Sequence, residues 1–469
     1  MSLMDVARGA YVRSPTVVRR SLAPLVALVP TKTKFGSVYQ SWRQRIAAAA
    51  ASPALADAEH RKALRALLRK AHAGSPFYRD LLDKALGRGF DLDSFEPADL
   101  TRLPVLTKAD LREAGDDVLA VPRSQVDTGD TSGSNGERPF RFYLDRDRSA
   151  REMAFVYNGW SRVGFTEKDA KVVLRGFGLD PRGQFIHEWE PALRELRLSV
   201  FPMTRDDVRL YLDMIDARGI RYLYGYPSAI EILCRHMDRL NRYPRQPLLG
   251  ILPISEPVYA HQRRAIASSL GAPIANFYGL SEKVLFALEN EDLSYTFEPL
   301  YGAAELVDDE GRPITEVGKE GRIVGTGFLS TGMPFIRYHT EDRAALIEPA
   351  SAGNGQRLRL GQIVPRRKPD FLISANGSRV VTIDFTPEHP RYFQGIDEYQ
   401  FFQDTPGKCT IRYIPSEDGT PDDAARVAND LMQRTHGAIE FDTEEVMVLA
   451  GGRAGKRAFI DQRLDVSKY

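Results

Sequence analysis

Residues 131–139 form a run of small and hydroxyl-bearing side chains that could bind an anion. The run begins with six such residues: Thr131, Ser132, Gly133, Ser134, Asn135 and Gly136. Their backbone N–H groups and hydroxyls suit a phosphate group such as a triphosphate. The run lacks the Gly-Lys-Ser/Thr ending of a Walker A loop and the G-x-S-x-G pattern of a hydrolase elbow. An ordinary turn is the competing interpretation.

A second segment, Asn276–Glu282, places an aromatic ring beside small and acidic residues. The ring of Tyr278 could stack on a flat base. Ser281 and Glu282 could meet a phosphate and its Mg²⁺, because Mg²⁺ prefers carboxylate and phosphate oxygens. The alternative is a corner between a strand and a loop.

Three further segments add charged groups. Asp342, in the segment Pro334–Asp342, could accept two hydrogen bonds from a ribose diol, or it could form a salt bridge in a surface hairpin. Arg366–Asp370 is basic, with a solvated linker as its alternative. Lys456 follows Gly455 near the C-terminus and could be an exposed lysine on a tail.

The elements that must position these residues alternate between strands and helices. Short β-branched and apolar runs predict strands at 171–174, 222–224, 249–253, 274–278 and 322–325. Amphipathic segments predict helices at 206–219, 227–240 and 257–270. This alternation argues for an α/β body with mostly parallel sheets flanked by helices.

The two ends of the chain have different patterns. Residues 36–86 are predicted to be helical, with an apolar stripe at Leu64, Leu67, Leu68 and Ala71. Ser75 followed by Pro76, and Thr107 followed by Asp110, have the spacing of helix starts. A loop is expected at 349–358. After residue 366, strands at 370–385, 408–414 and 444–449 and a helix at 421–437 predict a small α+β domain. We therefore divide the chain into domains at 1–365 and 366–469.

Composition excludes several classes of function. The 469 residues are 43% hydrophobic and 27% charged, which is ordinary for a globular protein of two or three domains. A net charge of +1 provides no basic field, so no nucleic-acid partner is expected. Cys234 and Cys409 lie in no metal-ligand pattern, which disfavours structural zinc and disulfides and favours a cytoplasmic location. Cys234 lies on an apolar helix face and is predicted to be a core residue.

The N-terminus is basic, since residues 1–50 hold eight Lys or Arg and one acidic residue, Asp5. The apolar run at 22–29 is too short to span a bilayer. Residues 1–35 either pack on the body as a helix or make peripheral contact with an anionic membrane, which would make the protein membrane-associated.

In their order and spacing, these segments resemble the adenylate-forming superfamily of acyl-CoA synthetases and adenylation domains. The phenylacetate–CoA ligase-like and capsular polysaccharide biosynthesis branch is the most similar. The resemblance covers nearly the whole chain. It runs through 72–78, 103–108, 131–143, 224–228, 254–256, 278–282, 337–342, 367–370, 376–377 and 455–456.

The resemblance implies a two-domain enzyme with a large body and a small mobile C-terminal lid. ATP and a carboxylic acid would give an acyl-adenylate and pyrophosphate, with Mg²⁺ as the metal. A thiol (CoA or a carrier protein), an amine or a hydroxyl would then take the acyl group. Homodimers occur among such enzymes, and the sequence does not locate an interface.

The resemblance implies roles for individual residues at the positions that match the family's motifs. Residues 131–136 would hold the β- and γ-phosphates, and Tyr278, with Gly279 beside it, would contact adenine. Ser281 would contact the α-phosphate, and Glu282 would hold Mg²⁺.

The remaining roles concern the ribose, the lid and the acid. Asp342 would bind the ribose hydroxyls, with Arg337 as a structural partner and Arg367 also reaching the ribose. Lys456 would bridge the attacking carboxylate and the α-phosphate. By analogy, the acid pocket would be lined from segments around 175–179, 187–189, 226–228 and 254–256, with His187, Tyr226, Ser228 and Glu256 as candidate residues; a loop cap is the alternative role of His187.

Four residues depart from the family's pattern: Asn135, Glu341, Arg366 and Pro369. Glu341 stands where glycine is usual, and Pro369 falls at the expected hinge, where a fixed φ would restrict rotation. The departures leave open a degenerate, non-catalytic member that binds nucleotide or acts as a scaffold. The presence of Glu282, Asp342, Arg367 and Lys456 argues against that alternative.

Overall fold

The computed structural model describes residues 35–469 apart from 131–139, 176–185, 201–202, 365–370, 382–394, 416–418, 448 and 450–459; of the preceding segment it describes only 18, 21–22, 25–26 and 29. The predicted phosphate loop, Arg366, Arg367, Pro369 and Lys456 therefore lie outside the described residues. So does most of the basic segment 1–35.

Three consecutive helices open the continuous part of the structure: α4 (Gly36–Ala51), α5 (Pro53–Gly74) and α6 (Pro76–Leu86). The four residues of the predicted apolar stripe on α5 are all buried. The Ser75 hydroxyl accepts a hydrogen bond from the Tyr78 N–H at 3.1 Å, which caps α6. Thr107 and Asp110 form the predicted capping box at the start of α7 (Lys108–Glu113). The helical prediction for 36–86 is confirmed.

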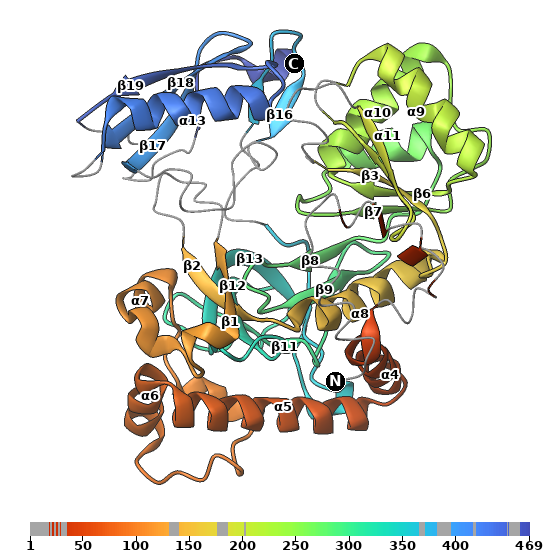
Figure 1. The fold of residues 1–469 in the computed structure, drawn as a ribbon. Coiled ribbons are helices and arrows are strands. Elements are labelled where there is room, and N and C mark those ends of the chain that lie inside the picture. Colours follow the sequence, from red (N-terminus) through yellow and green to blue (C-terminus); the bar gives the residue numbers. More distant parts are fainter. Residues whose placement is uncertain are drawn as a thin grey trace.

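A five-stranded sheet carries the predicted alternation of strands and helices, and it appears in yellow and green in Figure 1. Its order is β4-β5-β3-β6-β7. Its strands are β3 (Lys171–Leu174), β4 (His187–Glu190), β5 (Glu195–Leu198), β6 (Tyr222–Gly225) and β7 (Gly250–Pro253). All pairs are parallel except β4 with β5. Crossover helices α9 (Arg205–Arg218), α10 (Pro227–Leu240) and α11 (Ala260–Ser269) connect or follow its strands.

The second large sheet differs from the parallel pattern because hairpins, rather than helices, connect most of its strands. Its order is β11-β12-β13-β14-β10-β9-β8, and every pair is antiparallel. Its strands are β8 (Phe277–Gly279), β9 (Phe286–Glu289), β10 (Tyr295–Phe297), β11 (Gly302–Val307), β12 (Glu320–Gly327), β13 (Tyr338–Glu348) and β14 (Arg359–Leu360). Helix α8 (Arg148–Trp160) lies beside this sheet in Figure 1.

The elements after residue 370 form a smaller α+β unit, coloured blue in Figure 1. A hairpin of β15 (Phe371–Ile373) and β16 (Arg379–Val381) precedes a four-stranded sheet of order β19-β18-β17-β20. These strands are β17 (Ile396–Gln403), β18 (Lys408–Pro415), β19 (Glu440–Glu445) and β20 (Ile460–Gln462). Helix α13 (Pro421–Arg434) buries an apolar stripe of Ala424, Val427, Ala428 and Leu431. The buried Gln403 amide exchanges two hydrogen bonds with the backbone of Ile373, at 2.7 and 2.8 Å, and so ties β15 to β17.

A short hairpin and several 3₁₀ turns complete the described elements. The hairpin is β1 (Val126–Asp130) with β2 (Arg141–Asp145), which flank residues 131–139. The 3₁₀ turns are Pro97–Arg102, Gly115–Val118, Arg123–Gln125, Ser161–Val163, Ala352–Asn354 and Val466–Lys468.

Both cysteines are free and buried. Cys234 is fully buried in the core, which confirms the prediction of a core residue. Burial also raises the pKa of its thiol to about 12. In the part of the chain that the structure describes, no helix is long and apolar enough to cross a membrane.

Candidate active site

Tyr278 and Asp342 bring two of the sequence motifs together. Tyr278 lies on β8, at one edge of the antiparallel sheet, and Asp342 lies on β13. The Tyr278 hydroxyl donates a hydrogen bond to Asp342 Oδ2 at 2.6 Å. Burial and the neighbouring Asp342 carboxylate raise the pKa of Tyr278 well above its usual value. The phenol therefore stays protonated and remains a donor.

Glu282 is buried, with 4% of its surface exposed. Its Oε1 accepts a hydrogen bond from the Tyr338 hydroxyl at 2.7 Å. Burial, and to a smaller extent the negative charge of Glu282, raises the pKa of Tyr338 well above its usual value. The Tyr338 hydroxyl therefore stays protonated and remains a donor. The carboxylate is thus held in one orientation and has acceptor capacity left for a cation.

One fixed carboxylate fits Mg²⁺ better than it fits a metal held by protein side chains alone. Among the residues that the structure describes, no group of three or more His, Cys, Asp or Glu gathers in one place. Mg²⁺ keeps several waters and is commonly bound by one or two carboxylates together with substrate phosphates. A Mg²⁺ ligand at Glu282 stays a prediction from the sequence, and Glu282 is not among the residues that line the cavity described below.

Several motif segments contain strained backbone. Three of their non-glycine residues have left-handed backbone angles, Ser255 (φ 64°), Arg337 (φ 46°) and Glu341 (φ 73°), and so does Lys283 (φ 59°), which directly follows the Asn276–Glu282 segment. Such conformations are costly for L-residues and cluster at functional sites. At Glu341 the angle gives a physical reason why glycine suits this position. The Lys108 ammonium donates to Glu341 Oε2 at 3.0 Å and ties α7 to β13.

A cavity of about 740 Å³ lies between the two large sheets and α8. That volume lies within the range of small-molecule sites. Tyr278, Gly279, Ser281, Asp342 and Glu256 all line it. Its aromatic wall is formed by Phe35, Tyr157, Trp160, Tyr224, Phe277, Phe286 and Tyr295.

Other predicted residues lie elsewhere among the described residues. Arg337 is 2% exposed and donates to Glu305, to Leu103 O and to Gly311 O, which is the geometry of a structural residue. His187 lies on the edge strand β4, and Tyr226 is buried; neither is among the residues that line the cavity. Ser228 lies on α10, and its side chain is outside the described atoms.

The structure also places charged residues in the cavity that the motifs did not identify. Lys171 comes from β3, Glu195 and Arg197 come from β5, and Glu152 comes from α8. Arg175, the residue after β3, also lines the cavity, as expected for the segment 175–179. Lys283 also lines the cavity, and its place directly after the Asn276–Glu282 segment was a usable signal. Lys171, Glu195, Arg197 and Glu152 are scattered along the chain and carry no spacing pattern.

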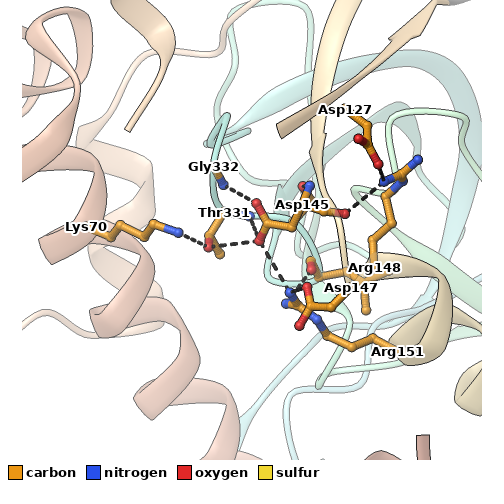
Figure 2. Close-up of polar contacts among 10 residues, drawn as sticks. Lys70, Asp127, Asp145, Asp147, Arg148, Arg151, Thr331 and Gly332 are labelled. Carbon is orange, nitrogen blue, oxygen red and sulfur yellow. Dashed lines mark hydrogen bonds and ion pairs between the residues drawn. The ribbon is translucent and has the colours of Figure 1, made fainter. Parts of the chain in front are cut away.

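The hairpin that flanks residues 131–139 is anchored to the body by a polar network around Asp145 (Figure 2). Asp145 Oδ1 accepts from the Gly332 N–H at 2.8 Å, and Oδ2 accepts from the Thr331 N–H at 3.0 Å. Lys70 donates to the Thr331 hydroxyl at 2.7 Å, and Arg151 reaches Asp145 Oδ2 at 3.4 Å. A Cβ on Gly332 would lie 2.6 Å from Asp145 Oδ1, so the approach requires glycine.

Relatives of known name match this chain over most of its length. CapK of Staphylococcus aureus is 22% identical over 396 residues, which are 82% of this chain and 84% of CapK. Phenylacetate-coenzyme A ligase of Thermus thermophilus is 29% identical over 330 residues, 66% of this chain and 70% of that enzyme. The resemblance to the adenylate-forming superfamily, in its phenylacetate–CoA ligase-like branch, is confirmed. No family model matches the chain.

Solved structures show the same fold. A 2-hydroxyisobutyryl-CoA ligase in complex with 2-HIB-AMP and CoA, in the thioesterification state, aligns with a TM-score of 0.54 at 19% identity. The alignment covers 88% of this chain and 90% of that one. The same enzyme in the postadenylation state gives 0.50 at 20% identity. An α/β body followed by a C-terminal α+β unit is therefore confirmed.

Proposed function

We propose that this protein is an AMP-forming ligase that activates a carboxylic acid with ATP and passes the acyl group to a thiol, with CoA as the first candidate. The observation that carries the proposal is the contact of 2.6 Å between Tyr278 and Asp342 on the wall of a cavity that Ser281 also lines. An aromatic face, a carboxylate that would bind ribose and a hydroxyl that would bind phosphate thus line one cavity.

The adenosine of ATP would lie against Tyr278. A carboxylate accepts several hydrogen bonds, so Asp342 can bind ribose hydroxyls while it remains bonded to the Tyr278 hydroxyl. Gly279 follows on the same strand and lines the cavity, so it leaves the base unobstructed. Arg367 is predicted to reach the ribose from outside the described residues.

The reacting groups are both anionic, since the carboxylate of the acid must approach the α-phosphate of ATP. Mg²⁺, held by Glu282 and phosphate oxygens, would neutralise part of that charge when bound. Ser281 would donate to the α-phosphate. The phosphate loop at 131–136 and Lys456 are predicted to supply the remaining donors and the cation that bridges the two anions.

CoA is favoured as the acceptor because several similar proteins are named CoA ligases. A carrier-protein thiol, an amine or a hydroxyl would use the same adenylate. The chain is also similar to CapK, whose name states no acceptor, so the experiment below includes amine acceptors as well as CoA. A homodimer and peripheral membrane contact through 1–35 stay predictions from the sequence.

The proposal is tested by pyrophosphate release from ATP and Mg²⁺ over a panel of aromatic, fatty, amino and sugar acids. Hydroxylamine traps any acyl-adenylate as a hydroxamate, and Lys456→Ala serves as the inactive control. Release that requires both one class of acid and Lys456 supports adenylation, and adding CoA or amines then identifies the acceptor. Stabilisation by ATP without pyrophosphate release for any acid would instead favour the non-catalytic alternative.

A further inference from the structure

An ion pair forms part of the cavity wall close to the predicted phosphate contacts. The Lys283 ammonium donates to Glu152 Oε1 at 2.6 Å, and both side chains line the cavity. About a quarter of each side chain is exposed, 25% for Lys283 and 22% for Glu152. Lys283 lies two residues after Ser281, so the pair stands near the point where an acid bound next to ATP would lie.

The backbone holds Lys283 in this position at a cost. Its φ is 59°, in the left-handed region that lysine rarely adopts. The Lys283 N–H donates to Leu280 O at 3.1 Å, which closes the turn between β8 and β9. A strained residue persists when its surroundings determine its conformation. Here the turn fixes the backbone and Glu152 on α8 fixes the ammonium.

A second charged group borders the same cavity. Lys171 lies 3.1 Å from Glu195, and these side chains are 4% and 12% exposed. Arg197 lies 3.1 Å from Glu195 and also lines the cavity. Lys171 Nζ is 5.9 Å from the centre of the Trp160 ring. Charged groups and aromatic rings therefore both contribute to the wall.

Such a wall discriminates between classes of acid. A hydrocarbon group placed over Glu152 and Lys283 would displace water from both charges and return no hydrogen bond, which is unfavourable. A hydroxyl group can donate to the Glu152 carboxylate and accept from the Lys283 ammonium. Sites built to bond a substrate hydroxyl discriminate strongly against the analogue that lacks it.

We propose that the Glu152–Lys283 pair binds hydroxyl groups of the acid, so that the substrate class is hydroxylated carboxylic acids rather than hydrocarbon acids. The inference rests on the proposed function and specifies its substrate. The pair thereby determines specificity, whereas the nucleotide is bound by other residues.

The test compares acids that share a carbon skeleton, namely phenylacetate with 3,4-dihydroxyphenylacetate and hexanoate with gluconate. Binding is measured by calorimetry on the full chain, and turnover by pyrophosphate release. The variant Glu152→Leu/Lys283→Met replaces both charges together, and Lys283→Arg keeps the cation. The control Arg45→Met/Glu59→Leu removes a pair of the same length, 2.6 Å, whose residues do not line the cavity.

We expect the hydroxylated member of at least one couple to be preferred tenfold or more by the unmodified protein. The preference should fall below threefold in the double variant and persist in Lys283→Arg and in the control pair. A preference for hydrocarbon acids, no binding of either hydroxylated acid, or an unchanged preference in a folded double variant would overturn the inference. Pair-dependent binding of a hydroxylated acid without pyrophosphate release for any acid would refute the proposed function and leave the inference standing.

Discussion

Tyr278 and Asp342 are 64 positions apart in the chain, and one hydrogen bond joins them. We expect Asp342→Ala to weaken ATP binding by about 10- to 100-fold, because a hydrogen bond to a charged group contributes about 1.5–3 kcal/mol. Tyr278→Phe keeps the ring and should weaken binding only a few-fold. Calorimetric titration with ATP and Mg²⁺ measures both. Equal losses in the two variants would show that Asp342 acts mainly through Tyr278 rather than on the nucleotide.

Glu341 shows how a departure from the family's pattern is accommodated. Its φ of 73° disfavours any side chain, while Lys108 lies 3.0 Å from its carboxylate. Both Glu341→Ala and Glu341→Gly lose the ion pair, but alanine keeps the backbone strain that glycine relieves, so we expect the alanine variant to be less stable by about 1 kcal/mol. Urea denaturation of the two variants measures the difference. If alanine is as stable as glycine, the positive φ is not maintained in solution.

Motif residues could be predicted from the sequence because their chemistry is concentrated in short segments. Tyr278, Ser281 and Glu282 lie within five positions, and Asp342 ends another such segment. The residues that the sequence could not place in the cavity, such as Glu152 and Lys171, come from different elements. Their proximity depends on how α8 packs against both sheets, and no local pattern encodes that packing.

At the scale of elements, the β1–β2 hairpin depends on one carboxylate. Asp145 accepts two backbone N–H groups from residues 331 and 332 and is 14% exposed (Figure 2). We expect Asp145→Ala to destabilise the protein by about 2 kcal/mol, because two donors lose their partner. The same variant should lower the rate of pyrophosphate release, since the hairpin flanks the predicted phosphate loop.

Asp127 provides the matched control for Asp145. It lies on β1, pairs with Arg148 at 2.7 Å and is 47% exposed. An exposed pair contributes little, so Asp127→Ala should cost less than about 1 kcal/mol. Thermal unfolding and pyrophosphate release are measured on both variants. Similar effects at the two positions would contradict a special role for Asp145.

Elements with strong local signals were predicted correctly, and one miss has a clear physical cause. The range of α10 was predicted to the residue, and β7 nearly so, because an apolar run and an amphipathic helix dominate their windows. The last strand was expected at 444–449, but β19 spans Glu440–Glu445, whose side chains are mostly acidic and exposed. Pairing with β18 determines its register, and its own composition does not.

At the scale of the whole molecule, stability should depend on pH through His60. Burial is the largest cause that lowers the pKa of His60, to about 4, although Nδ1 donates to Pro299 O at 2.8 Å. Between pH 4 and 6.5 the unfolded chain binds a proton that the folded protein does not. The free energy of unfolding is therefore undiminished by His60 above pH 6.5, and it falls by up to about 3 kcal/mol as the pH falls to 4.

The variant His60→Asn isolates that contribution, since its amide can still donate to Pro299 O and does not titrate in this range. The free energy of unfolding, measured in urea from pH 4 to 7.5, should rise less steeply with pH in this variant than in the unmodified protein. Identical slopes would mean that carboxylates alone cause the acid sensitivity.

The coupling between the two predicted domains concerns Pro369, which lies outside the described residues. Our domain boundary at 365/366 is a proposal, and the family's hinge falls at Pro369 by position. Proline fixes φ near −65°, whereas a rotation of the lid between adenylation and acyl transfer needs a backbone angle to change. We expect Pro369→Gly to speed acyl transfer and to leave pyrophosphate release unchanged. Single-turnover assays measure each half-reaction separately.

Pro365→Gly is the matched control, because it adds the same backbone freedom four residues earlier. A gain from both substitutions would indicate a loosened linker, and unchanged transfer in Pro369→Gly would place the pivot at another residue.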